Sequence, residues 1–259
     1  MPAPIIWLAS YPRSGNTWMR TLLFSYFHGR PESSKDIAKH FPDLHVEGQY
    51  DPAAAGRQIV KTHLPFGPNH AHIERTAGAI VMLRHPKDVL LSSLDFHHVL
   101  GTKTNMGGLE PDRFADVFIE QGGDPIWIQN GFGSWAQFYD SWSEETGTPR
   151  LVLKYEEMRA DAVPGLRRAV QFLGEAADES RLAQAAKMAS FDNMRAMEIR
   201  EKAKAPAKNV FFGGNQGNLR KGELFMRKGR VGASLDDIRP GLDAAFERAF
   251  GAALGRHGY

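Results

Sequence analysis

Short apolar runs alternate with segments of helical periodicity along most of this chain. Four apolar runs predict buried strands, at Ile5 to Ala9, Ile59 to Thr62, Ala79 to Arg84 and Pro149 to Tyr155. Apolar residues three or four positions apart predict helices from Asn16 onward and at 87–99, 114–120, 134–142, 163–173, 178–188, 191–203 and 235–254. Strands that alternate with helices favour an α/β fold with a mostly parallel central sheet flanked by helices on both faces.

Three segments lack this periodicity. Gly29 to Asp51 is rich in Pro, His and Asp, and it predicts a loop with one helical turn. Residues 100–130 hold five glycines around one short helix, and residues 204–224 are rich in Gly, Asn and Lys with Phe211-Phe212 at their centre. Long loops inside a compact domain are usually functional lids or disordered segments. We therefore expect 100–130 and 204–224 to be mobile segments that bound an acceptor site.

Composition narrows the class of protein. The 259 residues, 42% of them hydrophobic, fit a single domain over 1–259. A formal net charge of +2 argues against a broad nucleic-acid-binding surface, and the lack of cysteine excludes disulfides, thiolate metal sites and a cysteine nucleophile. No apolar run of signal-peptide length follows Met1, and no later run is long enough to span a membrane. We expect a soluble, cytoplasmic protein.

The segment after the first strand has the features of a phosphate-binding loop. A helix that follows a loop of small residues offers free backbone N–H groups and the positive end of its dipole to an anion. Arg13 adds a permanent cation, and Gly15 lets the backbone come close to a ligand. Ser14 and Thr17 add hydroxyl donors, and either Asn16 or Thr17 can cap the helix. The pattern is not a Walker A loop, and an ordinary strand–turn–helix corner with a solvated arginine is the less favoured alternative.

Polar residues also follow the next two strands. Lys61, Thr62 and His63 end the second strand, Arg84 ends the third, and Ser92 lies in the helix that comes next. In doubly wound sheets, ligands bind beyond the carboxyl ends of the strands, so these residues lie where chemistry is expected. A strand end that happens to be polar, and a helix serine without a ligand, remain open at this point.

Five separated stretches resemble the motifs of sulfotransferases that use 3′-phosphoadenosine-5′-phosphosulfate (PAPS). In chain order they are Tyr11-Pro-Arg-Ser-Gly-Asn-Thr-Trp18, Lys61-Thr-His-Leu-Pro65, Arg84-His-Pro-Lys-Asp-Val-Leu-Leu-Ser92, Lys154-Tyr-Glu-Glu-Met158 and Phe225-Met-Arg-Lys-Gly229. The first is similar to the family's 5′-phosphosulfate loop, and the second reproduces its Lys-Thr-His-Leu-Pro. Chance is a poor explanation, because the five occur in the family's order and span nearly the whole chain.

The resemblance implies a fold and a reaction. The fold is a single α/β domain whose phosphosulfate-binding strand–loop–helix is like that of P-loop kinases. The reaction is transfer of the sulfuryl group of PAPS to a hydroxyl of a small-molecule or natural-product acceptor, leaving adenosine 3′,5′-bisphosphate (PAP), with no metal. His63 is then the general base, and Arg13 and Lys61 stabilise charge on the leaving phosphate and the transferring group.

PAPS carries two anionic groups, so such an enzyme needs an anion site on each side of one nucleoside. The loop from Arg13 to Thr17 supplies the first. For the 3′-phosphate, the resemblance implies Arg84, Ser92, Arg227, Lys228 and the backbone of Gly229. For the adenine it implies Trp18, Tyr155 and Phe191, although the spacing of Trp18 equally fits packing against the sheet. Candidate acceptor contacts are Phe66, Phe96 and His97.

Two features depart from the soluble branch of the family. Arg13 replaces its usual lysine, which puts a proton-donor role in doubt but retains a cation. The sequence after Gly229 lacks the C-terminal dimer motif of the animal enzymes, and the opening stretch looks closer to bacterial sulfotransferases that modify natural products. The alternative hypotheses are a P-loop kinase or other NTPase, and a non-catalytic adenine-nucleotide-binding protein.

Overall fold

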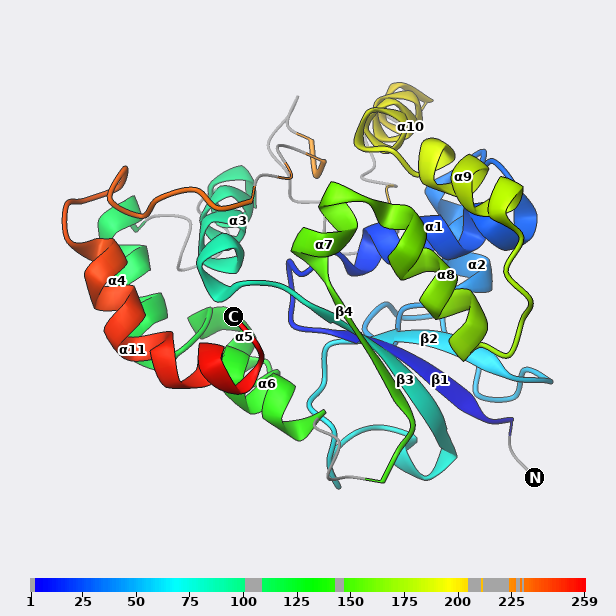
Figure 1. The fold of residues 1–259 in the computed structure, drawn as a ribbon, viewed down its shortest axis with the longest axis horizontal. Coiled ribbons are helices and arrows are strands. Elements are labelled where there is room, and N and C mark those ends of the chain that lie inside the picture. Colours follow the sequence, from blue (N-terminus) through cyan, green and yellow to red (C-terminus); the bar gives the residue numbers. More distant parts are fainter. Residues whose placement is uncertain are drawn as a thin grey trace.

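The computed structural model describes residues 3–100, 109–142, 147–204, 211, 224–226, 229 and 231–259. Within them one sheet is formed by β1 (Ile5–Ser10), β2 (Gln58–Thr62), β3 (Thr76–Leu83) and β4 (Arg150–Lys154). All its strands are parallel, in the order β2-β1-β3-β4 (Figure 1), and Trp7 of β1 pairs with Val60 and Ala79 of the neighbouring strands. The predicted α/β fold with a parallel sheet is confirmed.

Helices make the crossovers that parallel strands require. They are α1 (Asn16–His28), α2 (Ser34–His40), the 3₁₀ turn η1 (Ile73–Arg75), α3 (Pro86–Leu100), α4 (Pro111–Gln121), α5 (Pro125–Gln129), α6 (Trp135–Ser141), α7 (Tyr155–Ala160), α8 (Ala162–Phe172), α9 (Glu179–Met188), α10 (Phe191–Lys204) and α11 (Leu242–Arg256). Figure 1 shows α1, α8 and α9 on one side of the sheet and α4, α6 and α11 on the other. Helices therefore cover both faces, as predicted.

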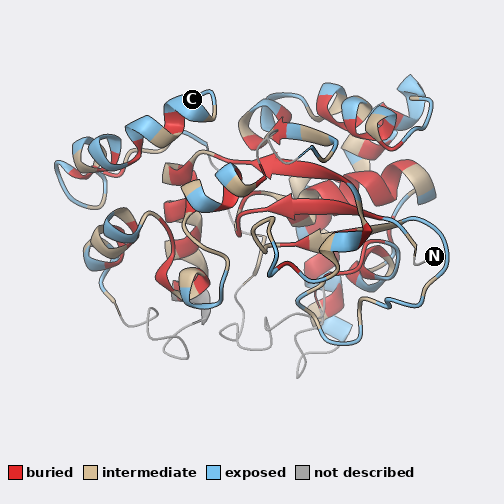
Figure 2. Cartoon of the chain, turned by 90° about the horizontal axis from the view of Figure 1, so that it is seen from below, coloured by how far each residue is buried: buried red, intermediate tan, exposed pale blue. Residues whose placement is uncertain are grey.

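The sheet separates two hydrophobic cores, because successive side chains of a strand point to opposite faces. Trp7 of β1 belongs to a core with Phe118 of α4 and Phe246 of α11. The adjacent residue Leu8 belongs to the other core, with Leu22 of α1 among its members. Figure 2 shows the buried residues gathered in the strands and on the inner sides of the helices. Burial on both faces explains why the strands read as uninterrupted apolar runs.

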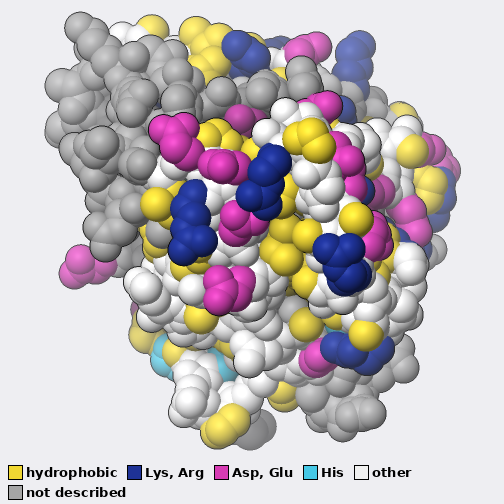
Figure 3. All heavy atoms as spheres, turned by 90° about the vertical axis from the view of Figure 1, so that its left-hand side faces the viewer, with side chains coloured by type: hydrophobic (Ala, Val, Ile, Leu, Met, Phe, Trp, Pro, Cys, Tyr) yellow, Lys and Arg dark blue, Asp and Glu magenta, His cyan; other side chains and the backbone are white. Residues whose placement is uncertain are grey.

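Charges of both signs are interspersed over the face formed by α4 and α11 (Figure 3). Arg239 and Asp116 form an ion pair of 2.6 Å there, which joins the segment before α11 to α4. Among the residues that the structure describes, no helix has the length and apolar character to cross a membrane.

Two elements differ from their predicted form. The stretch predicted as a loop with one helical turn contains α2, a helix of seven residues. Ser33 and Asp36 start it with a capping box, in which each side chain accepts the backbone N–H of the other residue. The last helix begins at Leu242 rather than at residue 235, because Pro240 interrupts the predicted helix and Gly241, at a φ of 86°, is the N-cap.

The segments expected to be mobile are described only in part. Residues 109–130 fold into α4 and α5, each with a proline in its first turn. The rest of the first segment, 101–108, lies outside the described residues, and so do 205–210 and 212–223 of the second. Phe211 is described and fully buried, with its ring centroid 6.1 Å from that of Phe225.

Candidate active site

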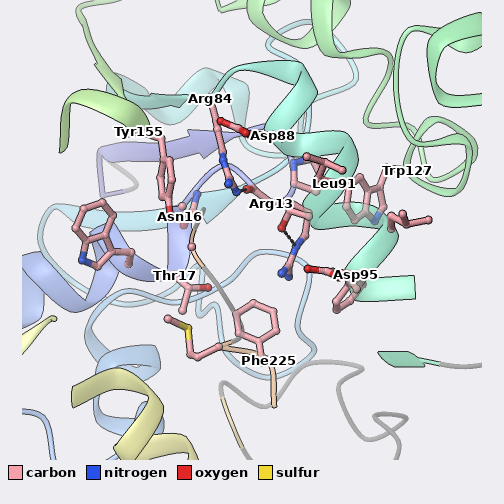
Figure 4. Close-up of a pocket in the computed structure, with 18 of the residues that line it drawn as sticks. Arg13, Asn16, Thr17, Arg84, Asp88, Leu91, Asp95, Trp127, Tyr155 and Phe225 are labelled. Carbon is pink, nitrogen blue, oxygen red and sulfur yellow. Dashed lines mark hydrogen bonds between the residues drawn. The ribbon is translucent and has the colours of Figure 1, made fainter. Parts of the chain in front are cut away.

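A cavity of about 730 Å³ lies beyond the carboxyl ends of β1, β2 and β3. The loop before α1, the end of β2 and one side of α3 form part of its wall. Further parts come from α5, α7 and α10, from Phe225, Met226 and Gly229, and from residues of the segments 43–46 and 233–238. Figure 4 shows Arg13, Arg84 and Tyr155 converging on this space from separate elements. The cavity lies at the sheet edge where doubly wound proteins bind ligands, and it collects most of the predicted site residues.

Glycine shapes the loop before α1. Gly15 is the N-cap of this helix, with a φ of 90°, and a Cβ atom there would lie 2.6 Å from the Tyr155 ring. Asn16 and Thr17 follow on the cavity wall. The first-turn N–H groups, for which an α-helix has no acceptors, therefore lie at that wall. The prediction that Asn16 or Thr17 caps the helix is wrong, because both are inside the helix and Gly15 precedes them.

One side chain at the start of α1 and one in the loop before it contact neighbouring elements. The Asn16 amide donates to the Leu8 carbonyl at 2.9 Å and to the Ser10 hydroxyl at 3.1 Å. The Ser14 hydroxyl is buried 3.2 Å from the Tyr139 hydroxyl. Ser14 is not among the residues that line the cavity, and its role as a donor to an anion stays a prediction.

The Arg13 guanidinium contacts two aromatic rings. Its central carbon is 4.7 Å from the centroid of Phe96 and 4.7 Å from that of Phe225. Its Nε donates to the Ser92 hydroxyl at 3.1 Å. Arg13 and Ser92 are 79 positions apart in the sequence, so the structure brings two of the predicted anion-binding residues together.

Arg84 forms a second cationic point beside the first. It is buried, its Nη1 donates to the Arg13 carbonyl at 2.8 Å, and its guanidinium stacks 4.3 Å from the centroid of the Tyr155 ring. Trp18 meets the Tyr155 ring edge-on at 5.6 Å and donates from its indole N–H to the Ala189 carbonyl at 3.0 Å. The predicted residues Arg84, Tyr155 and Trp18 thus form one continuous wall.

Lys61, the penultimate residue of β2, forms an ion pair with Asp43, an acid that lies outside the five family motifs. Its Nζ lies 2.5 Å from Asp43 Oδ2, and buried Arg20 donates to the nearby Phe41 carbonyl. Burial would raise the pKa of the Asp43 carboxyl, but the charges of Lys61 and Arg20 hold that pKa well below its usual range. Burial lowers the pKa of Lys61, and Asp43 opposes that shift.

The geometry around His63 leaves one ring nitrogen available as a base. Nδ1 lies 2.6 Å from the Ser10 carbonyl, which can only accept, so Nδ1 carries the proton and Nε2 has the lone pair. Burial and the Lys61 charge bring the pKa of His63 well below 6.5, so the ring is neutral at pH 7. His45 stacks on it at 5.5 Å and accepts its backbone N–H at 2.8 Å.

The candidate acceptor contacts divide between the cavity and the core. Phe96 and His97 line the cavity. His97 is buried, and its Nε2 lies 2.6 Å from Asp124 Oδ2. Phe66 is not among the lining residues, and its ring packs 5.0 Å from that of Trp142. Phe66 as an acceptor contact stays a prediction.

The last group of predicted contacts is described only in part. Phe191 and Gly229 both line the cavity, and a Cβ atom at Gly229 would lie 3.5 Å from the Phe191 ring and from the Tyr155 hydroxyl. Arg227 and Lys228 lie outside the described residues.

A family model described as "Sulfotransferase domain" matches residues 3–258. The chain belongs to this sulfotransferase family. Its resemblance to the family, first noted in five short stretches, is thus shown across nearly its whole length.

Three relatives of this sulfotransferase-family chain are 26–27% identical to it. It is 26% identical over 186 residues to human "Sulfotransferase 4A1", a match that covers 68% of the chain and 62% of that relative, less than two thirds of its length. It is 27% identical over 254 residues to "Cytosolic sulfotransferase 13" of Arabidopsis thaliana, which covers 90% of the chain and 71% of the relative. "Luciferin sulfotransferase" of Photinus pyralis is 26% identical over 260 residues, with 88% and 67% covered.

Solved structures show the same fold. The crystal structure of mouse sulfotransferase SULT7A1 complexed with PAP has a TM-score of 0.69 at 22% identity, covering 97% of this chain and 84% of that one. Retinol dehydratase in complex with androsterone and PAP has a TM-score of 0.64 at 20% identity, with 98% and 82% covered.

The family motifs contain many of the residues that line the cavity, but other lining residues lie outside them. Among the missed residues are Arg20, Asp43, His45, Trp127, Phe132 and Arg159. Two had a readable signal: Arg20 is a charged residue among the apolar positions of a helix, and Asp43 follows a proline as a turn residue. The others come from long-range packing and have no local signature.

Proposed function

We propose that this chain is a PAPS-dependent sulfotransferase that transfers the sulfuryl group to a hydroxyl of a small-molecule or natural-product acceptor. The observation that carries the proposal is the convergence of Arg13, Ser92 and Arg84 with a neutral His63 on one cavity. The proposed location of the protein is the cytoplasm, in line with the relative named a cytosolic sulfotransferase.

The residues present fit a doubly phosphorylated adenosine. The α1 N-terminus and Arg13 suit a 5′-phosphosulfate, because backbone N–H groups, the helix dipole and a guanidinium all favour an anion there. Arg84 and Ser92 suit the 3′-phosphate. Between them, the rings of Trp18, Tyr155 and Phe191 offer flat surfaces to an adenine. Arg227 and Lys228 remain proposed contacts to the 3′-phosphate.

In the proposed mechanism His63 Nε2 takes the proton of the acceptor hydroxyl as the oxygen attacks sulfur. The new S–O bond forms while the bond from sulfur to the 5′-phosphate oxygen breaks, and PAP leaves. Lys61 and Arg13 stabilise the charge that develops on the leaving phosphate and the transferring group. The Ser10 carbonyl stabilises the imidazolium by accepting its Nδ1–H.

The proposed acceptor is an apolar molecule. The Phe132 ring lies 5.7 Å from the His63 imidazole, and the same cavity is also lined by Trp127 and Phe96. Such a surface suits an aromatic or alicyclic body that presents a single hydroxyl. Phe96 and His97 remain proposed acceptor contacts.

The direct test is transfer of radiolabelled sulfate from PAPS to a panel of phenols and alcohols, with PAP binding measured by calorimetry in EDTA. We expect labelled product and magnesium-independent PAP binding. ATP hydrolysis with magnesium would instead support the P-loop kinase or NTPase alternative. PAP binding with no transfer to any acceptor of the panel would support a non-catalytic nucleotide-binding protein.

A further inference from the structure

Two glutamates on α10 are buried one turn apart. Glu198 is fully buried and Glu201 is 9% exposed. Glu201 accepts both the backbone N–H and the hydroxyl of Ser34, so it joins α10 to the start of α2. A buried carboxylate requires such partners, because burying an unpaired charge is strongly destabilising. Glu198 has different partners, and they lie beside the cavity.

The Glu198 carboxylate binds two consecutive backbone N–H groups. Phe225 N–H donates to Oε1 at 2.6 Å, and Met226 N–H donates to Oε2 at 2.9 Å. Lys202 Nζ also lies 2.9 Å from Oε1, one turn further along α10. Because each carboxylate oxygen holds a different peptide group, both the position and the orientation of residues 225–226 are fixed.

This backbone position determines where the Phe225 ring lies. The ring covers the Arg13 guanidinium at 4.7 Å and meets Phe96 edge-on at 6.4 Å. Figure 4 shows the Phe225 ring next to the Arg13 side chain, where both line the cavity. A cation–π contact of this kind depends on the ring remaining over the cation. The path from Glu198 to Arg13 therefore has one intermediate, Phe225.

We propose that Glu198 is a positioning residue for the sulfuryl-transfer site, acting on Arg13 through the backbone and ring of Phe225. This inference rests on the proposed function. Glu198 itself lies outside the residues that line the cavity and makes no proposed contact with the nucleotide. Its carboxylate would set the affinity for PAP and PAPS by holding Phe225 over the guanidinium that binds the 5′-phosphosulfate.

The test compares Glu198→Gln with Glu201→Gln. Both changes remove one buried carboxylate from the same helix, and only the first carboxylate holds residues 225–226. A glutamine at 198 turns an NH₂ group toward one of the two N–H donors, so a charge-assisted bond is lost. We expect PAP to bind about 10- to 100-fold more weakly to Glu198→Gln, with a matching rise in KM for PAPS. Glu201→Gln should lower thermal stability and leave PAP affinity unchanged.

A double-mutant cycle with Phe225→Leu isolates the path. If Glu198 acts through Phe225, the double variant binds PAP about as weakly as the worse single variant. If the fold-losses of PAP affinity in the two single variants instead multiply in the double variant, the inference is overturned. Wild-type PAP affinity in Glu198→Gln would overturn it too, and both outcomes leave the proposed function intact. Failure of the wild type to bind PAP would overturn both. If Glu198→Gln does not fold, weakened PAP binding by Phe225→Leu alone supports the inference, and unchanged binding overturns it.

Discussion

Three contacts prepare His63 to accept a proton. The Ser10 carbonyl fixes the tautomer, the stacked His45 ring orients the imidazole, and burial beside Lys61 keeps the ring neutral. The sequence motif predicted His63 and Lys61, but it contained neither His45 nor Asp43. These two come from the irregular segment before β2, which has no periodicity to read, and a hydrogen-bonded bridge between Asp43 and Lys61 places them.

Replacing His63 tests the base directly. We expect His63→Ala to lower kcat by about 10²- to 10⁴-fold, the usual contribution of a positioned general base. PAP affinity should remain unchanged, because His63 lies on the acceptor side of the proposed site. Turnover is measured at saturating PAPS and acceptor, with His40→Ala on the exposed part of α2 as the matched control. Retention of most of the turnover by His63→Ala contradicts the assignment.

Asp43 should influence the pH profile through two neighbours. Its negative charge raises the pKa of both His63 and Lys61. Removing that charge in Asp43→Asn therefore lowers both pKa values. The acid limb of kcat/KM, where His63 becomes protonated, moves to lower pH, and the basic limb, where Lys61 loses its proton, moves in the same direction. The measurement is kcat/KM against pH for both proteins, and a basic limb that moves to higher pH would refute this coupling.

At the scale of elements, the strand–loop–helix at the start of the chain could be predicted well and its cap could not. The apolar run and the small residues after it gave the correct positions of β1 and α1. The predicted N-cap was wrong because the Asn16 side chain donates hydrogen bonds to the sheet, a tertiary contact that rules for helix ends do not include. The start of α11 was missed for a local reason, since Pro240 should have ended the predicted helix.

Gly15 and Gly241 form a natural control pair for this loop. Both are helix N-caps in nearly the same conformation, with φ of 90° and 86°. An alanine pays about 1 kcal/mol or more of strain at either position, but at Gly241 its Cβ would meet no atom within 4 Å, whereas at Gly15 it would overlap the Tyr155 ring. We expect Gly15→Ala to lower both stability and PAP affinity.

Gly241→Ala should lower stability alone, by the smaller amount that backbone strain accounts for. The two free energies of unfolding come from urea titration, and PAP affinity from calorimetry. Equal losses of stability, with PAP affinity intact in both variants, would mean that the close approach of Tyr155 to the loop is not required.

At the scale of the molecule, the fold class could be predicted from the sequence, but the order of the strands in the sheet could not. Alternating strands and helices predicted a parallel sheet with two covered faces, which is the observed fold. The order β2-β1-β3-β4 could not be read from the chain, because it depends on which crossovers pack best. This order places β1 between β2 and β3, and it thereby brings the Arg13 loop next to both His63 and Arg84.

Because the proposed nucleotide touches elements from both ends of the chain, binding should stabilise the whole fold. A ligand at 100 times its Kd adds about 2.7 kcal/mol to the free energy of unfolding, which corresponds to a rise in Tm of about 5–10 °C for a domain of this size. We expect PAP in EDTA to produce that rise in a thermal melt. Adenosine 5′-monophosphate at the same concentration should produce a smaller one, because it leaves Arg84 and Ser92 without the 3′-phosphate. Equal shifts from the two nucleotides would show that Arg84 and Ser92 do not read that phosphate, and a shift only with magnesium and ATP would favour a kinase-type site.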